Sequence, residues 1–525
     1  MLVNKEVQKI DIEFIHHGAV NGVTGSCHQI NIEHTSSYLV DCGLFQGAEA
    51  SDHSTKQTKL DSNNSQTTNL ADHAHSINFP LDNIIALLVT HCHIDHVGRI
   101  PYLLAAGFRG PIYCSSATAK LLPLVIEDAV KVGVSKNKQL INKVLTRLQQ
   151  QLVAVDYHQW QAIASNDKNI KVKIKFKPAG HILGSAYIEL DIIKELNFNQ
   201  NPNLDTDTDQ AINNATKKSS PSKLSHRVVF SGDLGACNTP LLPAPTPPYG
   251  CDTLIIESTY GDKNHHGRKL RRQNLERILK SCISDKGLVL IPAFSIGRTQ
   301  ELLYEIEEIL HQLHRKQYQY LSNDEQLLNQ ISVIVDSPLA NEFTEHYKEL
   351  KQHWDNEAKI KLSQNRHPLS FKELYCAGDH QEHLNIIDFY KQNQQPAIII
   401  AASGMCSGGR IVNYLASFIE DKTTDILFVG YQAKGTLGRD IINFSSKKDG
   451  YVHIDHTKSV IKAGVHNLSG YSAHADQHDL LRFIKRMRKK PKHIRIVHGD
   501  DKAKQALQQK IQHLVPNAKI LIPKD

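Results

Sequence analysis

The sequence predicts an α/β protein with two domains, and three observations support this prediction. The chain has 525 residues, which is more than one hydrophobic core usually holds. Strand-like runs dominate up to residue 258, whereas long helical patterns alternate with short apolar runs from about residue 265. After about residue 466 the chain returns to short strand and helix units, which end in HIRIVHGD and AKILIPKD.

In the first part, runs of apolar and β-branched residues predict strands. The run IIALLV (84–89) is apolar throughout, which is typical of a strand buried on both faces. Helical patterns are interleaved mainly at 97–107 and 117–150. The predicted strands, in order, are DIEFIHHG, CHQINIE, YLVDCG, IIALLVTH, PIYCSS, KVKIKFKPAG and TLIIEST.

In the second part, four apolar runs each precede a helical pattern: GLVLIPAF, ISVIVDSP, AIIIAAS and DILFVGYQ. This alternation predicts a parallel, doubly wound sheet. Two other segments, 51–76 and 197–226, are poor in apolar residues and rich in Asn, Ser, Thr, Asp and Gln. We expect both to be mobile loops. The second separates SAYIELDII from RVVFSGD and therefore extends a hairpin.

The composition indicates the cellular compartment and the kinds of partner that the protein can have. Nine cysteines are scattered without a CxxC pair, and the first residues contain no apolar segment typical of a secretory signal. We therefore expect a cytoplasmic protein. No apolar run approaches the length of a membrane span, so no membrane partner is expected. The net charge of +7 permits a polyanionic partner but does not require one.

A cluster of potential metal ligands follows the buried strand, in LVTHCHIDHVGRIP. Within six residues it contains His91, His93, Asp95 and His96. Side chains just past the carboxyl end of an interior strand face a crevice, which is where α/β proteins build sites. Cys92 points the opposite way from its neighbours if the segment is extended, so we expect it to pack in the interior.

Three further strand ends carry a ligand next to a glycine: His181 in FKPAGHILGSA, Asp233 in VVFSGDLG and His498 in IRIVHGD. Glycine allows the sharp backbone turn that such a position needs. Taken singly, each histidine is more often a hydrogen-bonded structural residue. Their combination with the first cluster favours a metal site with seven ligands.

The order of these motifs resembles that of the metallo-β-lactamase superfamily. The matching strings are HxHxDH at His91, GHxxGS at His181 and SGDLG at Asp233, with Asp41 in YLVDCGLFQG as the first motif. IESTYGD with Glu257, YSAHAD with His474 and IVHGD with His498 resemble the three extra motifs of the β-CASP nucleases. That family includes stand-alone bacterial and archaeal RNA-processing proteins and the endonuclease subunit of the pre-mRNA 3′-end cleavage complex.

The resemblance implies a metallo-β-lactamase αββα sandwich with an inserted β-CASP domain, a parallel doubly wound α/β sheet. The expected boundaries are 1–260 and 469–525 for the sandwich and 261–468 for the insertion. The resemblance also implies two zinc ions per chain, and Asp41 as a carboxylate that orients a ligand histidine. The implied ligands are His91, His93 and His181 for one zinc, Asp95, His96 and His498 for the other, and Asp233 as the bridge.

Two zinc ions about 3.5 to 4 Å apart can share a hydroxide and stabilise an in-line displacement at phosphorus. The resemblance therefore implies phosphodiester hydrolysis, with Asp95 and Asp233 as catalytic ligands. His474 would be the general acid for the leaving group, and Glu257 would hold it in position. From the residues alone, the favoured interpretations are structural, with Glu257 as a buried strand-end carboxylate and His474 as a helix-start residue.

The predicted second domain repeats one string after three strands: FSIGR, CSGGR and GTLGR, which end at Arg298, Arg410 and Arg439. A helix N-terminus with an arginine suits a phosphate group. We expect these arginines, with Ser337 and Ser403, to bind the RNA backbone. Ordinary N-capping beside a solvated arginine remains an equal alternative, and the basic run KRMRKKPKHIR (485–495) is interpreted as a solvated surface segment.

Together these features predict a zinc-dependent ribonuclease that acts on single-stranded RNA. Endonucleolytic cleavage is expected, with 5′-to-3′ exonuclease activity left open, as is a homodimer. In the family, DNA-specific members carry valine at the last motif, so His498 favours RNA. The alternatives are a DNA-processing nuclease, a small-molecule hydrolase of the glyoxalase type, and a scaffold subunit that has lost catalysis. The inserted domain and the complete ligand set argue against the last two.

Overall fold

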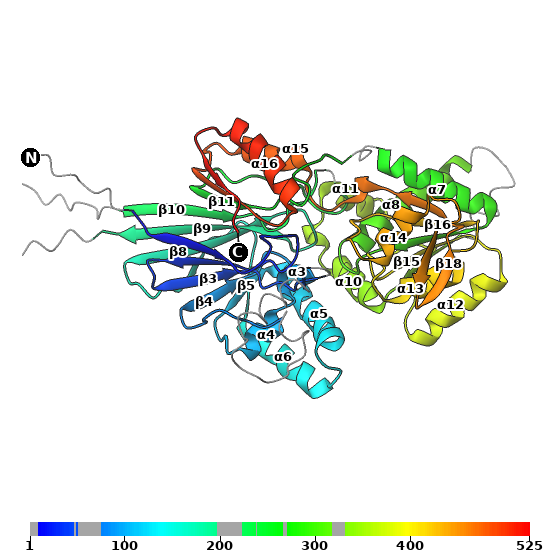
Figure 1. Cartoon of the computed structure of the whole chain (residues 1–525), viewed down its shortest axis with the longest axis horizontal. Coiled ribbons are helices and arrows are strands. Elements are labelled where there is room, and N and C mark those ends of the chain that lie inside the picture. Colours follow the sequence, from blue (N-terminus) through cyan, green and yellow to red (C-terminus); the bar gives the residue numbers. More distant parts are fainter. Residues whose placement is uncertain are drawn as a thin grey trace, which may run out of the picture.

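The computed structural model describes residues 9–46, 49, 50, 75–196, 223–237, 239–265, 270–317 and 331–524. The predicted loops at 51–76 and 197–226 lie almost entirely outside these ranges. Two bodies lie side by side, a sandwich of two sheets and an α/β domain at one end of it (Figure 1). Within the described residues, no helix combines the length and the apolar character that crossing a bilayer requires.

Two mixed sheets form the sandwich. The first has the order β1 (Ile12–His16), β2 (His28–Ile32), β3 (Ser36–Val40), β4 (Ile84–Leu88), β5 (Ile112–Ser115) and β6 (Leu152–Val155). The second has the order β21 (Lys519–Leu521), β20 (His493–Ile496), β11 (Thr253–Ile256), β10 (Lys223–Phe230), β9 (Ala186–Glu195), β8 (Ile170–Pro178) and β7 (Gln161–Ile163). All seven predicted strands are present, and β9 pairs antiparallel with β10, as the predicted hairpin requires. The short strands β6 and β7 were not predicted.

The apolar faces of the two sheets pack against each other. Residues from both, such as Ile30 and Val40 of the first and Ile174 and Ile188 of the second, belong to one buried cluster. In β8, KVKIKFK alternates buried and exposed residues, because one face of this strand meets the core and the other meets water. The sequence pattern therefore determines which face of each strand is buried.

Helices cover the outer face of each sheet, which gives the expected αββα layers (Figure 1). The first sheet is covered by α3 (Ile94–Val97), α4 (Ile100–Ala105), α5 (Ser116–Gly133) and α6 (Lys138–Gln151). The second is covered by α15 (Gln477–Arg486) and α16 (Asp501–Leu514), whose apolar residues pack against β11 and β20.

The other body contains a parallel sheet with the order β14 (Leu374–Cys376), β13 (Ser332–Asp336), β15 (Ala397–Ala401), β12 (Leu288–Pro292), β16 (Thr424–Phe428) and β19 (Gly464–Asn467). Every pairing in it is parallel, which confirms the predicted doubly wound sheet. Its helices are α7 (Arg271–Asp285), α8 (Arg298–Gln317), α10 (Pro338–Glu349), α11 (Asn356–Ser363), α12 (His380–Gln392), α13 (Arg410–Phe418) and α14 (Leu437–Phe444). A small hairpin, β17 (Tyr451–Ile454) and β18 (Thr457–Val460), and two short 3-10 helices, Lys351–His353 and Ser469–Tyr471, complete it.

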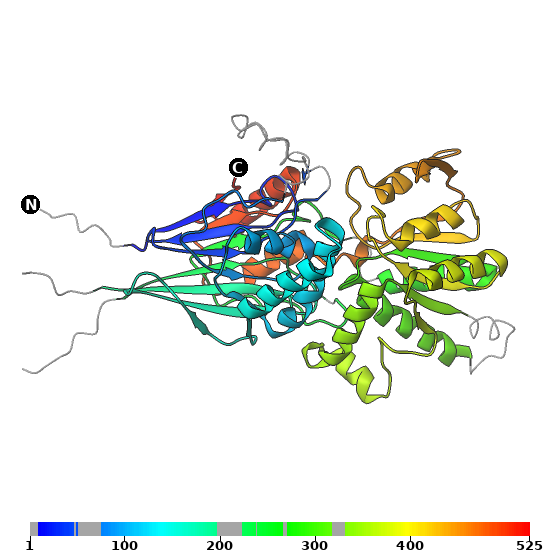
Figure 2. The same ribbon diagram turned by 90° about the horizontal axis from the view of Figure 1, so that it is seen from below.

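The chain leaves the sandwich after β11 and returns to it at β20. The strand β20 pairs in parallel with β11, so segments far apart in the sequence are neighbours in one sheet. These changes of sheet support the proposed domain boundaries at 260 and 468. The two bodies also lie side by side in the second view (Figure 2). They touch directly, because the backbone N–H of Leu183 donates to the Tyr347 hydroxyl at 3.1 Å.

Candidate metal centre and active site

The predicted ligands gather at the edge of the sandwich that faces the other body. His91 and His93 follow β4, and the short helix α3 carries Asp95 and His96. Because parallel strands and the turns after them end at the same edge, the loops after β8, β10 and β20 bring three more ligands there. These are His181, Asp233 and His498. The structure thus brings together all seven residues that the sequence singled out.

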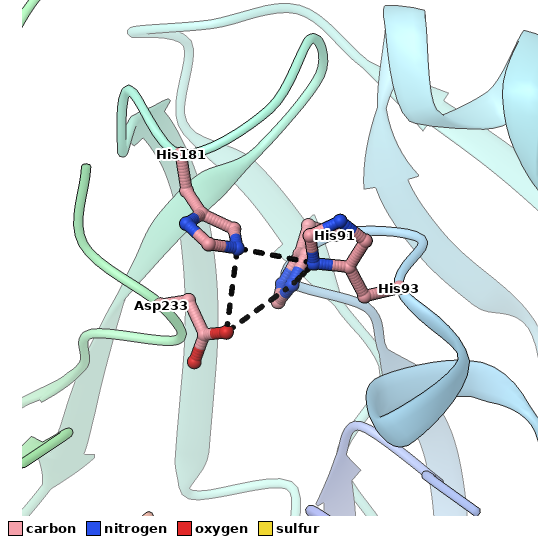
Figure 3. Close-up of side chains that lie close together, drawn as sticks. All are labelled: His91, His93, His181 and Asp233. Atoms are coloured by element: carbon pink, nitrogen blue, oxygen red, sulfur yellow. Dashed lines mark hydrogen bonds and ion pairs between the residues drawn. The ribbon is translucent and has the colours of Figure 1, made fainter. Parts of the chain in front are cut away.

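Four atoms form the first group: Nε2 of His91, Nδ1 of His93, Nε2 of His181 and a carboxylate oxygen of Asp233 (Figure 3). His93 Nδ1 lies 3.2 Å from His91 Nε2 and 3.0 Å from His181 Nε2. Asp233 Oδ2 lies 3.5 Å from both Nε2 atoms. The four atoms therefore converge on one point rather than on separate partners.

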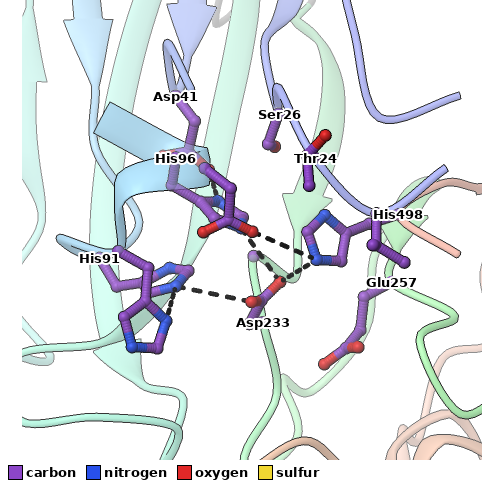
Figure 4. Close-up of polar contacts among 12 residues, drawn as sticks. Thr24, Ser26, Asp41, His91, His96, Asp233, Glu257 and His498 are labelled. Carbon is purple, nitrogen blue, oxygen red and sulfur yellow. Dashed lines mark hydrogen bonds and ion pairs between the residues drawn. The ribbon is translucent and has the colours of Figure 1, made fainter. Parts of the chain in front are cut away.

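The second group uses the other oxygen of the same carboxylate (Figure 4). Asp233 Oδ1 lies 3.3 Å from His96 Nε2 and 3.3 Å from His498 Nε2. Asp95 Oδ2 lies 3.8 Å from His96 Nε2 and 4.0 Å from His498 Nε2. Asp233 therefore stands between the two groups, with one oxygen facing each.

These separations fit zinc. Zn–N bonds are about 2.0–2.1 Å and tetrahedral, so two ligand atoms on one zinc lie about 3.3 Å apart. In addition, His96 Nε2 and Asp233 Oδ1 are buried and, among the described residues, make no hydrogen bond. A buried polar atom without a partner is costly, and a cation would satisfy both. Cys92 packs in the hydrophobic core, so no thiolate joins the imidazoles and carboxylates, a ligand set suited to a catalytic zinc.

Burial sets the ionisation of the ligands. It lowers the pKa of His93 to about 3 and lowers the pKa values of His91 and His181 strongly as well. These imidazoles are therefore neutral near pH 7, which is the form that binds a metal. At His96 burial also disfavours the charged form, but the carboxylates of Asp233 and Asp41 outweigh it and raise the pKa. The second group thus has an excess of buried negative charge that a cation would neutralise.

Asp41 lies behind the second group (Figure 4). Its Oδ2 is 2.7 Å from His96 Nδ1, on the far side of the ring from the converging atoms. Thr90 donates to the same carboxylate through its backbone N–H and its hydroxyl, both at 2.8 Å. Asp41 thereby fixes the ring of His96 with Nε2 pointing to the centre.

His474 and Glu257 form a pair beside the two groups. Glu257 Oε2 lies 3.2 Å from His474 Nδ1, and its Oε1 accepts the backbone N–H of Leu234 at 2.6 Å. Burial alone would lower the pKa of His474, but the charges of Glu257 and Asp233 outweigh it and raise the pKa to about 9. The His474 side chain is 22% exposed, compared with 1% for Glu257. The pair is therefore a protonated imidazole with access to the site, held by a buried carboxylate.

Three family models match separate parts of the chain. The metallo-beta-lactamase superfamily model matches residues 22–144, and the Beta-Casp domain model matches residues 299–441. A model described as a Zn-dependent metallo-hydrolase RNA specificity domain matches residues 459–523. The chain therefore contains metallo-β-lactamase and Beta-Casp domains, the two domains that its motifs resemble.

Curated relatives of this β-CASP chain come from bacteria and archaea. A ribonuclease of Thermus thermophilus is 29% identical over 94% of this chain and 95% of its own length. Proteins named transcription termination factor FttA, from Methanosarcina mazei and Methanocaldococcus jannaschii, are each 29% identical over 81% and 92% of this chain. The chain spans 60% and 66% of the length of these two archaeal proteins.

In the β-CASP domain, two of the three predicted phosphate-binding arginines are already paired. Arg298 is only 9% exposed and forms an ion pair with Glu301. Arg410 donates to the buried Asp336 at 2.5 Å and to the Gly378 carbonyl at 3.0 Å. The alternative of a solvated arginine therefore does not describe Arg298 or Arg410, because Glu301 in the first turn of α8 and Asp336 at the end of β13 pair with them. Phosphate binding by these two arginines would have to compete with the carboxylates.

The other three predicted phosphate-binding residues are Arg439, Ser337 and Ser403. Arg439 is exposed on α14, and no carboxylate of the described residues forms an ion pair with it. The Ser337 hydroxyl caps α10 by accepting the Ala340 N–H at 3.3 Å, and the Ser403 hydroxyl accepts the Ser407 N–H at 3.1 Å. The N-capping alternative therefore describes Ser337, and it also describes GTLGR, where the Thr436 hydroxyl accepts the Arg439 backbone N–H at 3.4 Å beside the exposed guanidinium. Phosphate binding by Arg439 stays a prediction.

Phe294, which sequence reasoning did not single out, borders the centre. It follows β12, is 42% exposed and has its ring centroid 6.5 Å from that of His93. An exposed aromatic ring beside a metal group can stack on a nucleobase. Its position directly after the strand in GLVLIPAF is the only signal that the sequence carries for it.

Proposed function

We propose that this protein is a zinc-dependent ribonuclease that hydrolyses phosphodiester bonds within single-stranded RNA. The observation that carries the proposal is the pair of four-atom groups that share Asp233, with His474 and Glu257 beside them. The metallo-β-lactamase and Beta-Casp domains support a metal-dependent hydrolase. The full-length similarity to a bacterial ribonuclease and the match to an RNA specificity domain support RNA as the substrate.

We assign one zinc ion to each group. When bound, two zinc ions would activate a water molecule and stabilise the negative charge that develops at phosphorus. The side chains of both groups hold the reacting phosphate next to His474 by holding the ions. Asp41 contributes indirectly, because it fixes the tautomer and the orientation of His96.

We assign the leaving-group proton to His474. The leaving ribose alkoxide is a strong base, so cleavage needs a proton donor within reach of it. His474 has a raised pKa and is surplus to the two metal groups. Glu257 is the positioning residue: its two oxygens are held by Leu234 and His474, so the imidazole cannot rotate away.

The proposal is tested with zinc-loaded protein and end-labelled single-stranded RNA and DNA of matched sequence. We expect internal cleavage of RNA, with 5′-phosphate and 3′-hydroxyl products. Preferential cleavage of DNA would establish the alternative of a DNA-processing enzyme, and absence of cleavage with full zinc loading would establish the scaffold alternative. Light scattering on the same sample tests the homodimer, and fractionation tests the cytoplasmic location that we propose.

A further inference from the structure

A basic cavity lies at the opposite end of the strands that carry the metal ligands. It has a volume of about 300 Å³ and is lined by β1, β11, β20 and β21 and the residues next to them. In the sheet, His493 at the start of β20 pairs with Thr253 on one side and Lys519 on the other. The metal centre follows the other ends of β11 and β20, at Glu257 and His498. With about 3.3 Å per strand residue, Thr253 beside the cavity and Glu257 beside the metal centre are about 13 Å apart.

The charge in this cavity is positive and largely uncompensated. Its lining includes Lys9, Arg495, Lys519 and the imidazoles of His226 and His493. Among the described residues, no carboxylate lies within ion-pair distance of Lys9, Arg495 or Lys519. The one lining carboxylate belongs to Asp11, which pairs with His34 at 2.9 Å. Like charges that share a cavity repel one another unless an anion joins them.

The His493 imidazole reports this positive field. Burial lowers the pKa of His493, and the nearby charges of Lys9, Lys519 and Arg495 lower it further. Arg495 is held in place by its stacking on the Phe14 ring, at 4.9 Å from the centroid, and by a 3.4 Å contact with His16 Nε2. Its guanidinium is therefore positioned without the help of a carboxylate.

We propose that this cavity is a second binding site of the protein, which takes a phosphate group of the RNA backbone away from the point of cleavage. The inference rests on the proposed ribonuclease function. The cavity is at the small end of the usual range for ligand sites, about 300–1,000 Å³, and so suits one nucleotide unit. Three of its basic residues, His493, Arg495 and Lys519, belong to the segment that matches the RNA specificity domain.

The site would increase the affinity for long RNA without taking part in chemistry. For single strands, each neutralised phosphate contributes about 0.7 to the slope of log binding constant against log salt concentration. Because the site takes one phosphate, loss of Lys9 and Lys519 would flatten the slope by about 0.7 and weaken binding about fivefold near 0.1 M salt. A dinucleotide at the metal centre is too short to reach the cavity, so its cleavage would not change.

The test uses the zinc-loaded full chain with the double change Lys9→Gln and Lys519→Gln. Both lysines are exposed, so the fold should be preserved, and thermal unfolding checks this. A second variant, Arg495→Gln, removes the half-buried cation by itself. The matched control is Lys136→Gln with Lys143→Gln, which removes the same charge from exposed lysines before and on α6, near the far edge of the first sheet.

Binding of a phosphorothioate-linked single-stranded RNA is measured by fluorescence anisotropy at several salt concentrations. We expect weaker binding and a flatter slope for the Lys9 and Lys519 variant, with kcat/KM on a dinucleotide and on bis(p-nitrophenyl) phosphate unchanged. Affinity and slope equal to those of the wild type, or an equal loss in the control, would overturn the proposal. If the wild type binds RNA but cleaves only the nitrophenyl diester, the proposed ribonuclease function fails while this site is still tested.

Discussion

Replacement of Glu257 by Gln should move the pH dependence of RNA cleavage. The amide oxygen of Gln can still accept the Leu234 N–H, so the backbone there should keep its position. The substitution removes the negative charge 3.2 Å from His474 Nδ1. That charge is a main reason why the pKa of His474 is about 9 rather than 6.5, since burial acts in the opposite direction.

The size of the effect follows from this shift. The acid acts in its protonated form, so activity is retained below the pKa of His474 and is lost as the pH rises through it. At about pH 7.5 a group with a pKa of about 9 is ~97% protonated, whereas a group with a pKa of 6.5 is ~9% protonated. Glu257→Gln should therefore reduce kcat roughly tenfold at this pH and less at lower pH.

The assay is the pH profile of kcat for single-stranded RNA, with zinc content measured for each sample. For the wild type, the midpoint of the alkaline limb should lie between pH 6.5 and about pH 9. Zinc bound at Asp233 would neutralise part of the negative charge that raises the pKa of His474 to about 9. The limb of the variant should lie at lower pH. A uniform loss at every pH with the limb unmoved would refute the reasoning and make Glu257 a purely structural residue.

His474→Ala should reduce RNA cleavage by about 100-fold to 10,000-fold, while zinc content and RNA affinity are preserved. The variant should lose far less activity on a nitrophenyl phosphodiester than on RNA, because the nitrophenol leaving group needs no proton. An equal loss on both substrates would contradict this prediction. Elemental analysis should find about two zinc ions per chain. Asp41→Ala should weaken metal affinity by about 10-fold to 100-fold, because His96 loses the carboxylate that orients its ring. Arg439→Ala should weaken RNA binding and flatten its salt slope by about 0.7 with no change in melting temperature. Arg410→Ala should instead destabilise the fold by about 1–3 kcal/mol, measured by denaturant unfolding, because the buried Asp336 carboxylate loses one partner and keeps His383 and Tyr414.

Much of the candidate site could be predicted because each ligand stands at the end of a strand-like run. HCHIDH follows an apolar strand, and SGDLG and IVHGD follow two others. Such runs are local signals, since the alternation or continuity of apolar residues depends only on which faces of a strand are buried. The short strands β6 and β7 carry weaker patterns and were missed.

The partners of the predicted phosphate-binding residues could not be predicted. Glu301 lies three residues after Arg298, but the sequence does not show that both are buried. Asp336 lies 74 residues before Arg410, and only the parallel pairing of β13 with β15 brings them together. Ion pairs between distant residues depend on the packing of whole elements, which no local pattern encodes.

The sequence by itself determined the parallel sheet of the second domain and the order of the ligand motifs, which carries the family resemblance, because periodicity and motif spacing are properties of short segments. Only the tertiary structure decided which atoms converge. Asp41 and His498 both adopt a left-handed backbone, at φ of 62° and 52°, which neither residue favours by itself. The surrounding sheets impose this conformation, and it aims one carboxylate at the back of His96 and one imidazole at Asp233. The basic cavity likewise exists only because β1, β20 and β21, from opposite ends of the chain, meet at the edge of the sandwich.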